Sequence, residues 1–368
     1  MKLNYFVLII AFCTLGLRCS STKTNSKEPN TLPATALQPY GRYVINQQQN
    51  LEMVSSAMHV GFSFEGNQCQ IFATIPDANG HNYLQYVLDG VYQKRVKLAG
   101  RSDESILITA LTGGKHTVWL YKATEAHTGP IVIQKITGNK LKPLRKATST
   151  RIEFIGNSIT CGAAADPSEV PCGSGLYHDQ HNAYMAYGPR VARALGTDFV
   201  LSSVSGIGVY RNWNSNGPTM PDVYERVDFR ASNPRRWNFN TFTPNVVSIA
   251  LGTNDFSQGD GKKERLPFDS ARYVTTYIKF IQVVKAKYPR AQLALLSSPM
   301  ISGKNREKLQ NCLTTVKVKI DAANPSDKPV ALHFFQPMLA RGCSGHPNVE
   351  DHAILAQELL PFFRKLLN

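Results

Sequence analysis

The chain has 368 residues, of which 42% are hydrophobic and 18% are charged, and it contains neither repeats nor low-complexity tracts. This composition excludes an intrinsically disordered protein and allows about two domains of ordinary size. The formal net charge of +15 does not indicate nucleic-acid binding, because Lys and Arg are scattered through both halves and no nucleic-acid module accompanies them.

The first 19 residues are expected to form a signal peptide. Lys2 precedes an apolar run from Tyr5 to Leu17, which is too short to span a bilayer comfortably and is typical of a secretory signal. Cys19 resembles the lipid-attachment cysteine of bacterial lipoproteins, although Arg18 stands where a small residue is usual. We therefore expect an exported bacterial protein in the periplasm, at the outer surface or outside the cell, with a lipid on Cys19 as its one candidate membrane anchor.

Residues 20–36 are rich in Ser, Thr, Asn, Lys and Pro and are expected to be a linker, followed by a β-sandwich domain over 37–148. The second range holds short β-type runs, such as "HVGFSFEG", "SILITAL" and "HTVWLYKA", separated by Gly, Asn and Asp turns. No convincing helical pattern intervenes, and many strands at this spacing predict an antiparallel sandwich. We expect an all-β, jelly-roll-like domain.

From residue 149 to residue 368 an α/β domain is expected, because strand and helix patterns alternate. The strands are expected at 151–156, 199–204, 245–251, 291–297 and 330–335. The clearest helix pattern begins after Asp269, a plausible N-cap. This alternation predicts a parallel, doubly wound sheet. In such sheets the ligand crevice lies beyond the carboxyl ends of the strands, so the residues that follow the strands are the candidates for a site.

Cysteine usage leaves the disulfide pattern open. Two of the seven cysteines lie in the signal region, and the other five are Cys69, Cys161, Cys172, Cys312 and Cys343. Since five is odd, at least one thiol stays unpaired. A bridge between Cys161 and Cys172 would close a short loop beside Ser158 and persist in an oxidising compartment, and the alternative is a set of buried thiols.

Four segments that follow predicted strands carry chemically usable groups. They are Gly156-Asn157-Ser158, "SGIG" at 205–208, "GTND" at 252–255 and "GHPN" at 345–348. In this order they resemble the blocks of the SGNH, or GDSL-type, hydrolases. With "NAYMAYGPRVARALG", "SGIGVYRNW", "TMPDVYERV" and "GCSGHPN", the chain resembles family two of the carbohydrate esterases, in which a small β-sandwich precedes the SGNH domain.

The resemblance implies a flavodoxin-like SGNH-hydrolase domain with a serine nucleophile and a histidine base. Ser158 would attack an ester carbonyl after His346 takes its proton. The resulting oxyanion would be bound by the backbone N–H groups of Ser158 and Gly206 and by the side-chain amide of Asn254. From the residues alone, Ser158 is equally a cap or turn residue, Gly206 and Gly208 are equally good turn glycines, and Asn254 is a loop cap.

The third member of a triad is in doubt. Asn157 replaces the aspartate of the commoner "GDS" spelling, which should affect loop geometry more than chemistry. Ser344 and Gly345 stand where family members often carry an aspartate and a large aromatic residue. We therefore predict a Ser158–His346 dyad, whose imidazole is oriented by a main-chain oxygen or by the Ser344 hydroxyl.

Other polar and aromatic residues near these blocks are expected to be structural. Asp255 is expected to cap its loop, Glu350 and Asp351 to face away from the site, and His352 to lie on a helix surface or pack. No HExxH signature exists, and His178 and His181 in "HDQH" are expected in a solvated loop, so we predict no metal and no cofactor. Three aromatic residues could stack on a sugar ring, but such residues are more often core or loop anchors, so we leave them out of the site: Tyr210, Trp213 and Trp237.

The sequence thus predicts an exported or surface-anchored esterase that removes O-acetyl groups from polysaccharides or oligosaccharides of the xylan and glucomannan type through a serine acyl-enzyme. The substrate class is implied by the family resemblance. The alternative is a catalytically impaired, carbohydrate-binding surface protein, which the missing acid at Ser344 keeps open.

Overall fold

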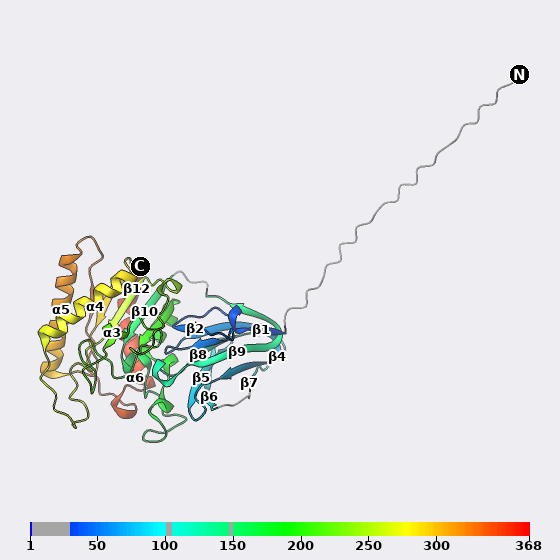
Figure 1. The fold of residues 1–368 in the computed structure, drawn as a ribbon, viewed down its shortest axis with the longest axis horizontal. Helices are drawn as coiled ribbons and strands as arrows, with labels where there is room; N and C mark the ends of the chain where they lie inside the picture. The colour runs from blue at the N-terminus through cyan, green and yellow to red at the C-terminus, as the bar shows by residue number, and fades with distance from the viewer. Residues whose placement is uncertain (2–29, 101–104, 147–149) are drawn as a thin grey trace.

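The computed structural model describes residue 1 and residues 30–100, 105–146 and 150–368, which form two domains (Figure 1). The predicted signal peptide over 1–19, apart from its first residue, and residues 20–29 of the predicted linker lie outside the described residues. Cys19, the candidate for lipid attachment, is among them.

The first domain is an antiparallel β-sandwich, as predicted. Its described elements are β1 (Thr31–Pro33), η1 (Ala34–Ala36), β2 (Tyr43–Ile45), β3 (Leu51–Met53), β4 (His59–Thr74), β5 (His81–Leu88), β6 (Val91–Ala99), β7 (Ile106–Thr109), β8 (Lys115–Lys122), η2 (Ala126–Thr128) and β9 (Ile131–Leu144). The strand order is β2-β3-β9-β4-β8-β5-β6, with β1 on β9 and β7 on β4. Strand β4 pairs with β8 through its first half and with β7 through its second, so the sheet folds over a core that includes Phe62 and Ile71.

The sandwich begins earlier than the sequence predicted. Strand β1 lies within the range 20–36 that we assigned to a linker, and it pairs with Lys135–Thr137 of β9. Its middle residue, Leu32, is 4% exposed, and Ala34 is 1% exposed. Two apolar side chains in a polar stretch are too weak a pattern to predict a strand. Their burial nevertheless makes residues 31–36 part of the folded domain.

The second domain contains a parallel five-stranded sheet, as predicted. Its strands are β10 (Arg151–Gly156), β11 (Asp198–Ser203), β12 (Val246–Ala250), β13 (Gln292–Leu296) and β14 (Ala331–His333). The order β11-β10-β12-β13-β14 is that of flavodoxin-like domains. The chain passes from β10 to β11 on one side and then to β12 on the other, so the strand order reverses at the carboxyl end of β10. A ligand crevice is expected there.

Helices cover both faces of this sheet (Figure 1). They are α1 (Ser158–Cys161), η3 (Tyr177–Gln180), η4 (Ala183–Met185), α2 (Tyr187–Leu195), α3 (Met220–Val223), η5 (Phe239–Thr241), α4 (Ser270–Lys287), α5 (Gly303–Ala323), η6 (Cys343–Gly345) and α6 (Val349–Leu367). Successive residues of β10 point to opposite faces: Phe154 packs with Tyr187 of α2 and Phe363 of α6, whereas Ile155 belongs to the cluster that includes α4 and α5. The predicted N-cap is confirmed, since Asp269 accepts from the N–H of Arg272 at 2.9 Å.

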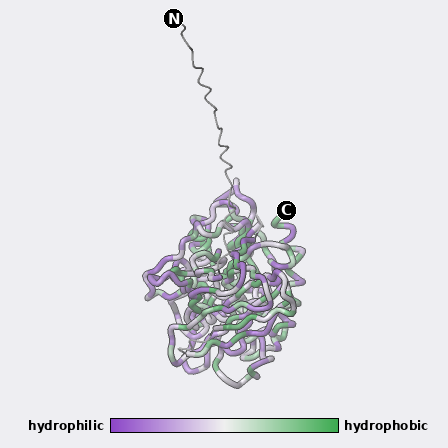
Figure 2. Tube along the Cα trace, turned by 90° about the vertical axis from the view of Figure 1, so that its right-hand side faces the viewer, coloured by the Kyte–Doolittle hydropathy of each residue, from purple (hydrophilic) through white to green (hydrophobic). Residues whose placement is uncertain are grey.

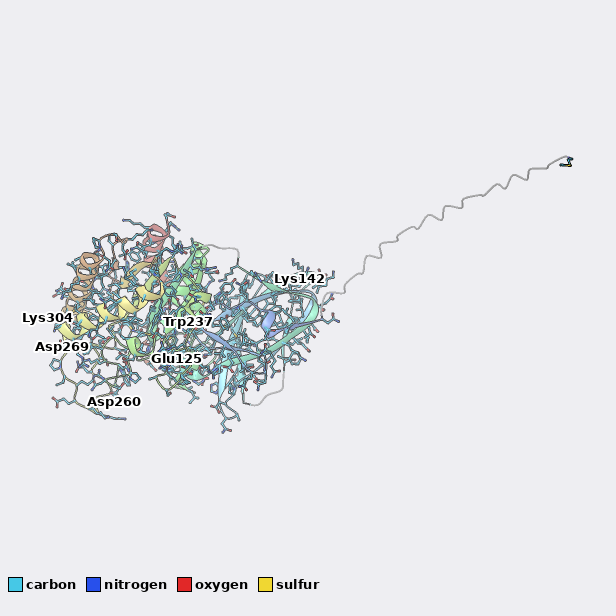
Figure 3. All side chains as sticks on the ribbon, turned by 45° about the horizontal axis from the view of Figure 1, so that its top comes forward. Glu125, Lys142, Trp237, Asp260, Asp269 and Lys304 are labelled. Carbon is cyan, nitrogen blue, oxygen red and sulfur yellow. A yellow bond between two sulfur atoms is a disulfide. The ribbon has the colours of Figure 1, made fainter. Side chains whose placement is uncertain are left out.

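The two domains are joined by buried polar contacts as well as apolar packing. Arg42 of the sandwich is fully buried and donates to the carbonyl oxygens of Tyr224 and Arg226 in the second domain, at 2.5 and 2.7 Å. Its guanidinium lies 3.8 Å from the Glu153 carboxylate of β10 and 4.4 Å from the ring centre of Trp237. Trp237 lies close to where the domains meet (Figure 3).

Hydrophobic and hydrophilic residues are interspersed along the chain (Figure 2). Within the part of the chain that the structure describes, no helix combines the length and apolar character that crossing a membrane requires.

Candidate active site

Ser158 lies at the carboxyl end of β10, at the reversal of strand order, as the first residue of the short helix α1. Asn157 is the N-cap, and its side-chain oxygen accepts from the N–H of Ile159 at 3.0 Å. It therefore shapes the loop, as expected. Gly156 is required by close approach, because a Cβ there would collide with the Thr160 side chain. The first N–H groups of a helix have no partner within the helix, so the Ser158 N–H is free to bind an anion.

His346 lies within hydrogen-bond distance of Ser158. Its Nε2 is 2.9 Å from Ser158 Oγ, and its Nδ1 is 3.0 Å from the main-chain oxygen of Ser344. The carbonyl can only accept, so Nδ1 carries the proton and Nε2 is left to accept from the serine hydroxyl. Burial lowers the pKa of His346 more than its bond to the Ser344 oxygen raises it, so the imidazole is neutral at neutral pH.

The loop geometry explains how a carbonyl reaches the imidazole. Ser344 adopts the left-handed conformation, with φ of 51° and ψ of 33°, and Gly345 follows with φ of 71°. The nearby acids are used elsewhere. Asp351 accepts from Arg341 Nε at 2.7 Å and belongs to the capping box of α6, and Glu350 is exposed.

Gly206 and Asn254 border the same space. Gly206 has φ of 74°, and a Cβ there would meet only the Trp213 side chain at 3.7 Å. Gly208, the alternative, is structural, because a Cβ would collide with the Arg211 carbonyl. Asn254 donates one side-chain N–H to the Ile207 oxygen at 2.8 Å, which fixes the amide and leaves its second N–H for a ligand.

Asp255 was expected to cap its own loop after β12, but it binds the backbone of the loop after β11. It is fully buried and accepts from the N–H groups of Val209 and Tyr210 at 3.0 and 2.9 Å. Burial raises its pKa to about 6 even though these hydrogen bonds lower it. Its carboxylate is occupied by the backbone of the loop that carries Gly206.

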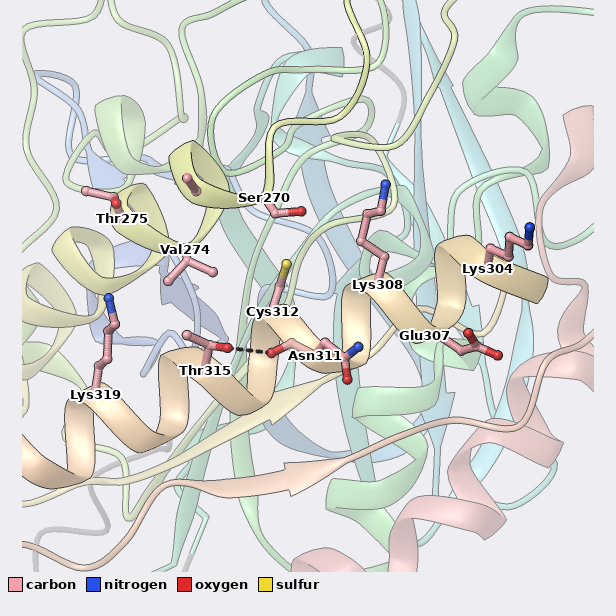
Figure 4. A pocket seen from close by; sticks show the side chains of 11 residues that line it. Ser270, Val274, Thr275, Lys304, Glu307, Lys308, Asn311, Cys312, Thr315 and Lys319 are labelled. Atoms are coloured by element: carbon pink, nitrogen blue, oxygen red, sulfur yellow. Dashed lines mark hydrogen bonds between the residues drawn. The ribbon is translucent and has the colours of Figure 1, made fainter.

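All four predicted site residues line one pocket of about 600 Å³, together with Tyr177, Trp213 and Met300. The structure therefore brings Ser158, Gly206, Asn254 and His346 together, and their catalytic roles stay predictions. A groove of about 750 Å³ lies between α4 and α5 and is lined by Lys304, Lys308, Cys312 and Lys319, among others (Figure 4). It contains none of the predicted site residues.

Sequence reasoning missed Tyr177 at the pocket and left Trp213 out of the site. The Tyr177 hydroxyl lies 3.3 Å from both His346 Nε2 and Ser205 Oγ. Trp213 was expected to be a core or loop anchor, but it is 46% exposed and borders the pocket. That expectation is confirmed for Tyr210 and Trp237, which are buried.

A buried carboxylate of the sandwich domain also reaches the site. Glu125 Oε2 accepts from the N–H of Ser205, the residue before Gly206, at 2.6 Å. Burial would raise the pKa of Glu125, but nearby His181 and the Ser205 N–H lower it to about 2. His181 is itself fully buried, with Nε2 3.6 Å from Glu125 Oε1, so the prediction of a solvated loop is wrong for this residue. His352 packs in the core against Tyr187.

Of the two alternatives left open for Cys161, the structure shows the buried thiol and not the bridge to Cys172. Cys172 pairs with Cys343 across 171 residues of sequence. Cys161 is a buried thiol whose Sγ lies 3.2 Å from Ser203 Oγ, beneath the site and away from the exposed loop of Cys172. Nearness in sequence suggested the first pairing, whereas the fold brings the loop of Cys172 to η6, just before His346.

Comparison with known proteins agrees with this architecture. Residues 40–147 match the family described as carbohydrate esterase 2 N-terminal, and residues 154–328 match the GDSL-like lipase/acylhydrolase family. The chain is 24% identical over 379 residues to an acetylxylan esterase / glucomannan deacetylase of Cellvibrio japonicus, with 100% of both chains covered.

Solved structures show the same two-domain fold. A family two carbohydrate esterase from Clostridium thermocellum in complex with cellohexaose is 25% identical, with a TM-score of 0.79 over 89% of this chain and 98% of that one. A carbohydrate esterase family 2 enzyme from Myceliophthora fergusii is 29% identical, with a TM-score of 0.74 over 90% of this chain and 99% of that one.

Proposed function

Because this chain belongs to carbohydrate esterase family 2, and carries both its N-terminal domain and a GDSL-like hydrolase domain, we propose that it removes O-acetyl groups from polysaccharides or oligosaccharides of the xylan and glucomannan type. The relative of Cellvibrio japonicus is described as an acetylxylan esterase / glucomannan deacetylase. The observation that carries the proposal is the 2.9 Å contact between Ser158 Oγ and His346 Nε2.

In the first half of the reaction, Ser158 Oγ attacks the acetyl carbonyl carbon while His346 Nε2 takes the hydroxyl proton. The charge that forms on the carbonyl oxygen is bound by the backbone N–H groups of Ser158 and Gly206 and by the side-chain N–H of Asn254. The Ser344 main-chain oxygen, 3.0 Å from Nδ1, holds the ring in place and stabilises the imidazolium.

Collapse of this intermediate breaks the bond between the carbonyl carbon and the sugar oxygen. His346 gives its proton to that oxygen, and the deacetylated sugar leaves. The second half repeats the same steps with water: His346 takes a proton from water, the hydroxide oxygen bonds to the acetyl carbon, and the bond to Ser158 Oγ breaks. Acetate is released and the serine hydroxyl is restored.

Two features support a carbohydrate substrate that reaches the site outside the cytoplasm. Trp213 is 46% exposed at the pocket edge, and an exposed indole face can pack against the C–H surface of a sugar ring. The Cys172–Cys343 disulfide supports export, because such bonds persist in oxidising compartments. We propose that the protein acts in the periplasm, at the outer surface or outside the cell.

Acetate release from acetylated xylan, acetylated glucomannan and small aryl acetates tests the proposal, with Ser158→Ala as the matched control. We expect release by the native protein and none by the variant, with unchanged circular dichroism, because the hydroxyl is the acyl acceptor. Binding of the polysaccharides without acetate release from any of these esters would instead support the carbohydrate-binding alternative.

A further inference from the structure

A cluster of two histidines and one aspartate lies where the sandwich meets the loop that borders the catalytic pocket. His81 begins β5 of the sandwich, whereas His178 and Asp179 lie on η3 of the hydrolase domain. One ligand atom of each of the three residues lies within 4.8 Å of the others. We propose that His81, His178 and Asp179 bind a divalent transition metal ion, with Zn²⁺ as the best match, and that this ion ties the two domains together.

The donor set favours zinc over the alkaline-earth ions. Two imidazole nitrogens and one carboxylate oxygen are a common set of Zn²⁺ ligands, whereas Ca²⁺ and Mg²⁺ prefer sites built from oxygen atoms. His81 Nε2 and Asp179 Oδ1 already contact each other, and His178 packs beside His81 with ring centres 4.6 Å apart. Both histidines are partly exposed, so water can complete the coordination.

The ligands are held in orientation by neighbouring groups. His178 Nε2 donates to the main-chain oxygen of His81 at 3.1 Å, which leaves Nδ1 with the lone pair that a metal needs. Asp179 Oδ1 accepts from the Tyr83 hydroxyl and Oδ2 accepts from the Leu176 N–H, both at 2.7 Å. Metal-binding histidines and carboxylates are oriented by outer hydrogen bonds of this kind.

The position of the cluster gives the ion a structural role. It would join β5 to η3, and η3 begins at Tyr177, whose hydroxyl lies 3.3 Å from His346 Nε2. An ion bound to His178 and Asp179, which follow Tyr177, would hold η3 against the sandwich. The ester chemistry uses no group of the cluster, so this inference stands apart from the proposed function.

Titration of the untagged, EDTA-treated full chain with Zn²⁺, followed by isothermal calorimetry, tests the proposal. We expect one ion per chain. The His81→Ala and His178→Ala variants should weaken Zn²⁺ binding by about 100-fold or more, and Tyr83→Phe, which removes an orienting group, by about tenfold. The absorption of bound Co²⁺ should be present in the native chain and absent from His178→Ala.

His116→Ala is the matched control. His116 Nδ1 contacts the Asp89 carboxylate at 2.6 Å in the same sandwich, but this pair has no second histidine. We expect Zn²⁺ affinity to be unchanged in the control, and circular dichroism establishes that each variant is folded. The proposal is overturned if the native chain binds no Zn²⁺ at concentrations up to about 1 mM, because binding weaker than this would not hold an ion in place. It is also overturned if the His178→Gln and Tyr83→Phe variants bind Zn²⁺ as tightly as the native chain.

Discussion

Glu125 connects the sandwich to the loop of Gly206, and Glu125→Gln tests whether that contact matters. The substitution keeps the size of the side chain and removes its charge. In the native protein Oε2 accepts from the Ser205 N–H at 2.6 Å, and the pKa of Glu125 is lowered from 4.5 to about 2. A difference of about 2.5 pKa units corresponds to roughly 3 kcal/mol in favour of the charged form.

The pH dependence follows from the direction of this shift. Because the pKa of Glu125 is lower in the folded state, its contribution to stability is fully present above pH 4.5 and is lost as the pH falls toward about 2. We expect Glu125→Gln to lower the free energy of unfolding by up to roughly 3 kcal/mol at pH 7, measured by urea denaturation. The difference from the native protein should shrink as the pH is lowered below 4.5.

Activity gives a second measurement. Complete removal of an oxyanion donor typically lowers kcat by about 100- to 1000-fold. Glu125 only positions the residue before Gly206, so we expect a fall in kcat of about tenfold on aryl acetates, with a smaller change in KM. The control is Glu169→Gln, since Glu169 pairs with Arg95 at 3.2 Å near the same junction. If Glu125→Gln matches this control in kcat, the positioning role is refuted, whatever happens to stability.

Four further substitutions test the site and the disulfide. Asn254→Ala should lower kcat by about 100-fold or more with little change in KM, because its amide binds charge that appears only in the transition state, and an effect on KM alone would make it a substrate-binding residue. Ser344→Ala should keep kcat, because His346 is oriented by the main-chain oxygen, and Ser344→Asp should keep or raise it; a fall in Ser344→Ala comparable to that in His346→Ala would show that the hydroxyl is the orienting group. Cys172→Ser should lower the free energy of unfolding by about 2–5 kcal/mol, and a reductant should lower the Tm of the native protein but not that of the variant; equal responses would contradict the pairing with Cys343.

The sequence predicted those features that depend on local pattern. Alternating strand and helix signals were sufficient for the parallel sheet, whereas its flavodoxin-like type was implied by the family resemblance. The carboxyl ends of the strands then defined where Ser158, Gly206, Asn254 and His346 would meet. The burial of Asp255 and its bonds to the backbone of the loop after β11 were not predicted, because they join two loops that are distant in the sequence.

The features that sequence did not predict depend on contacts between distant segments. Cys172 and Cys343 are 171 residues apart, and no local signal distinguishes this pair from Cys161 and Cys172. Glu125 comes from the other domain, in a stretch whose sequence suggested only a turn between strands. Tyr177 begins the short 3-10 helix η3, in a segment whose sequence has no periodic pattern, so its approach to His346 could be seen only once both segments were placed.

The buried contacts between the domains argue that the sandwich is part of the active unit and not an appended binding module. Arg42 and Glu153 are both fully buried, and each comes from a different domain. Burial lowers the pKa of Arg42, and the charge of Glu153 raises it. Burial raises the pKa of Glu153, and the charge of Arg42 lowers it. Each residue therefore helps its partner to stay charged in the core. Loss of one partner from a buried pair typically costs about 3–5 kcal/mol, because the other charge is left uncompensated. Separation of the domains would remove Arg42 from Glu153 on β10, the strand that carries Ser158, and would at the same time remove Glu125 from Ser205. The sandwich therefore supports the nucleophile through Glu153 and the oxyanion loop through Glu125, which explains why an esterase of this kind carries a β-domain so closely joined to its catalytic sheet.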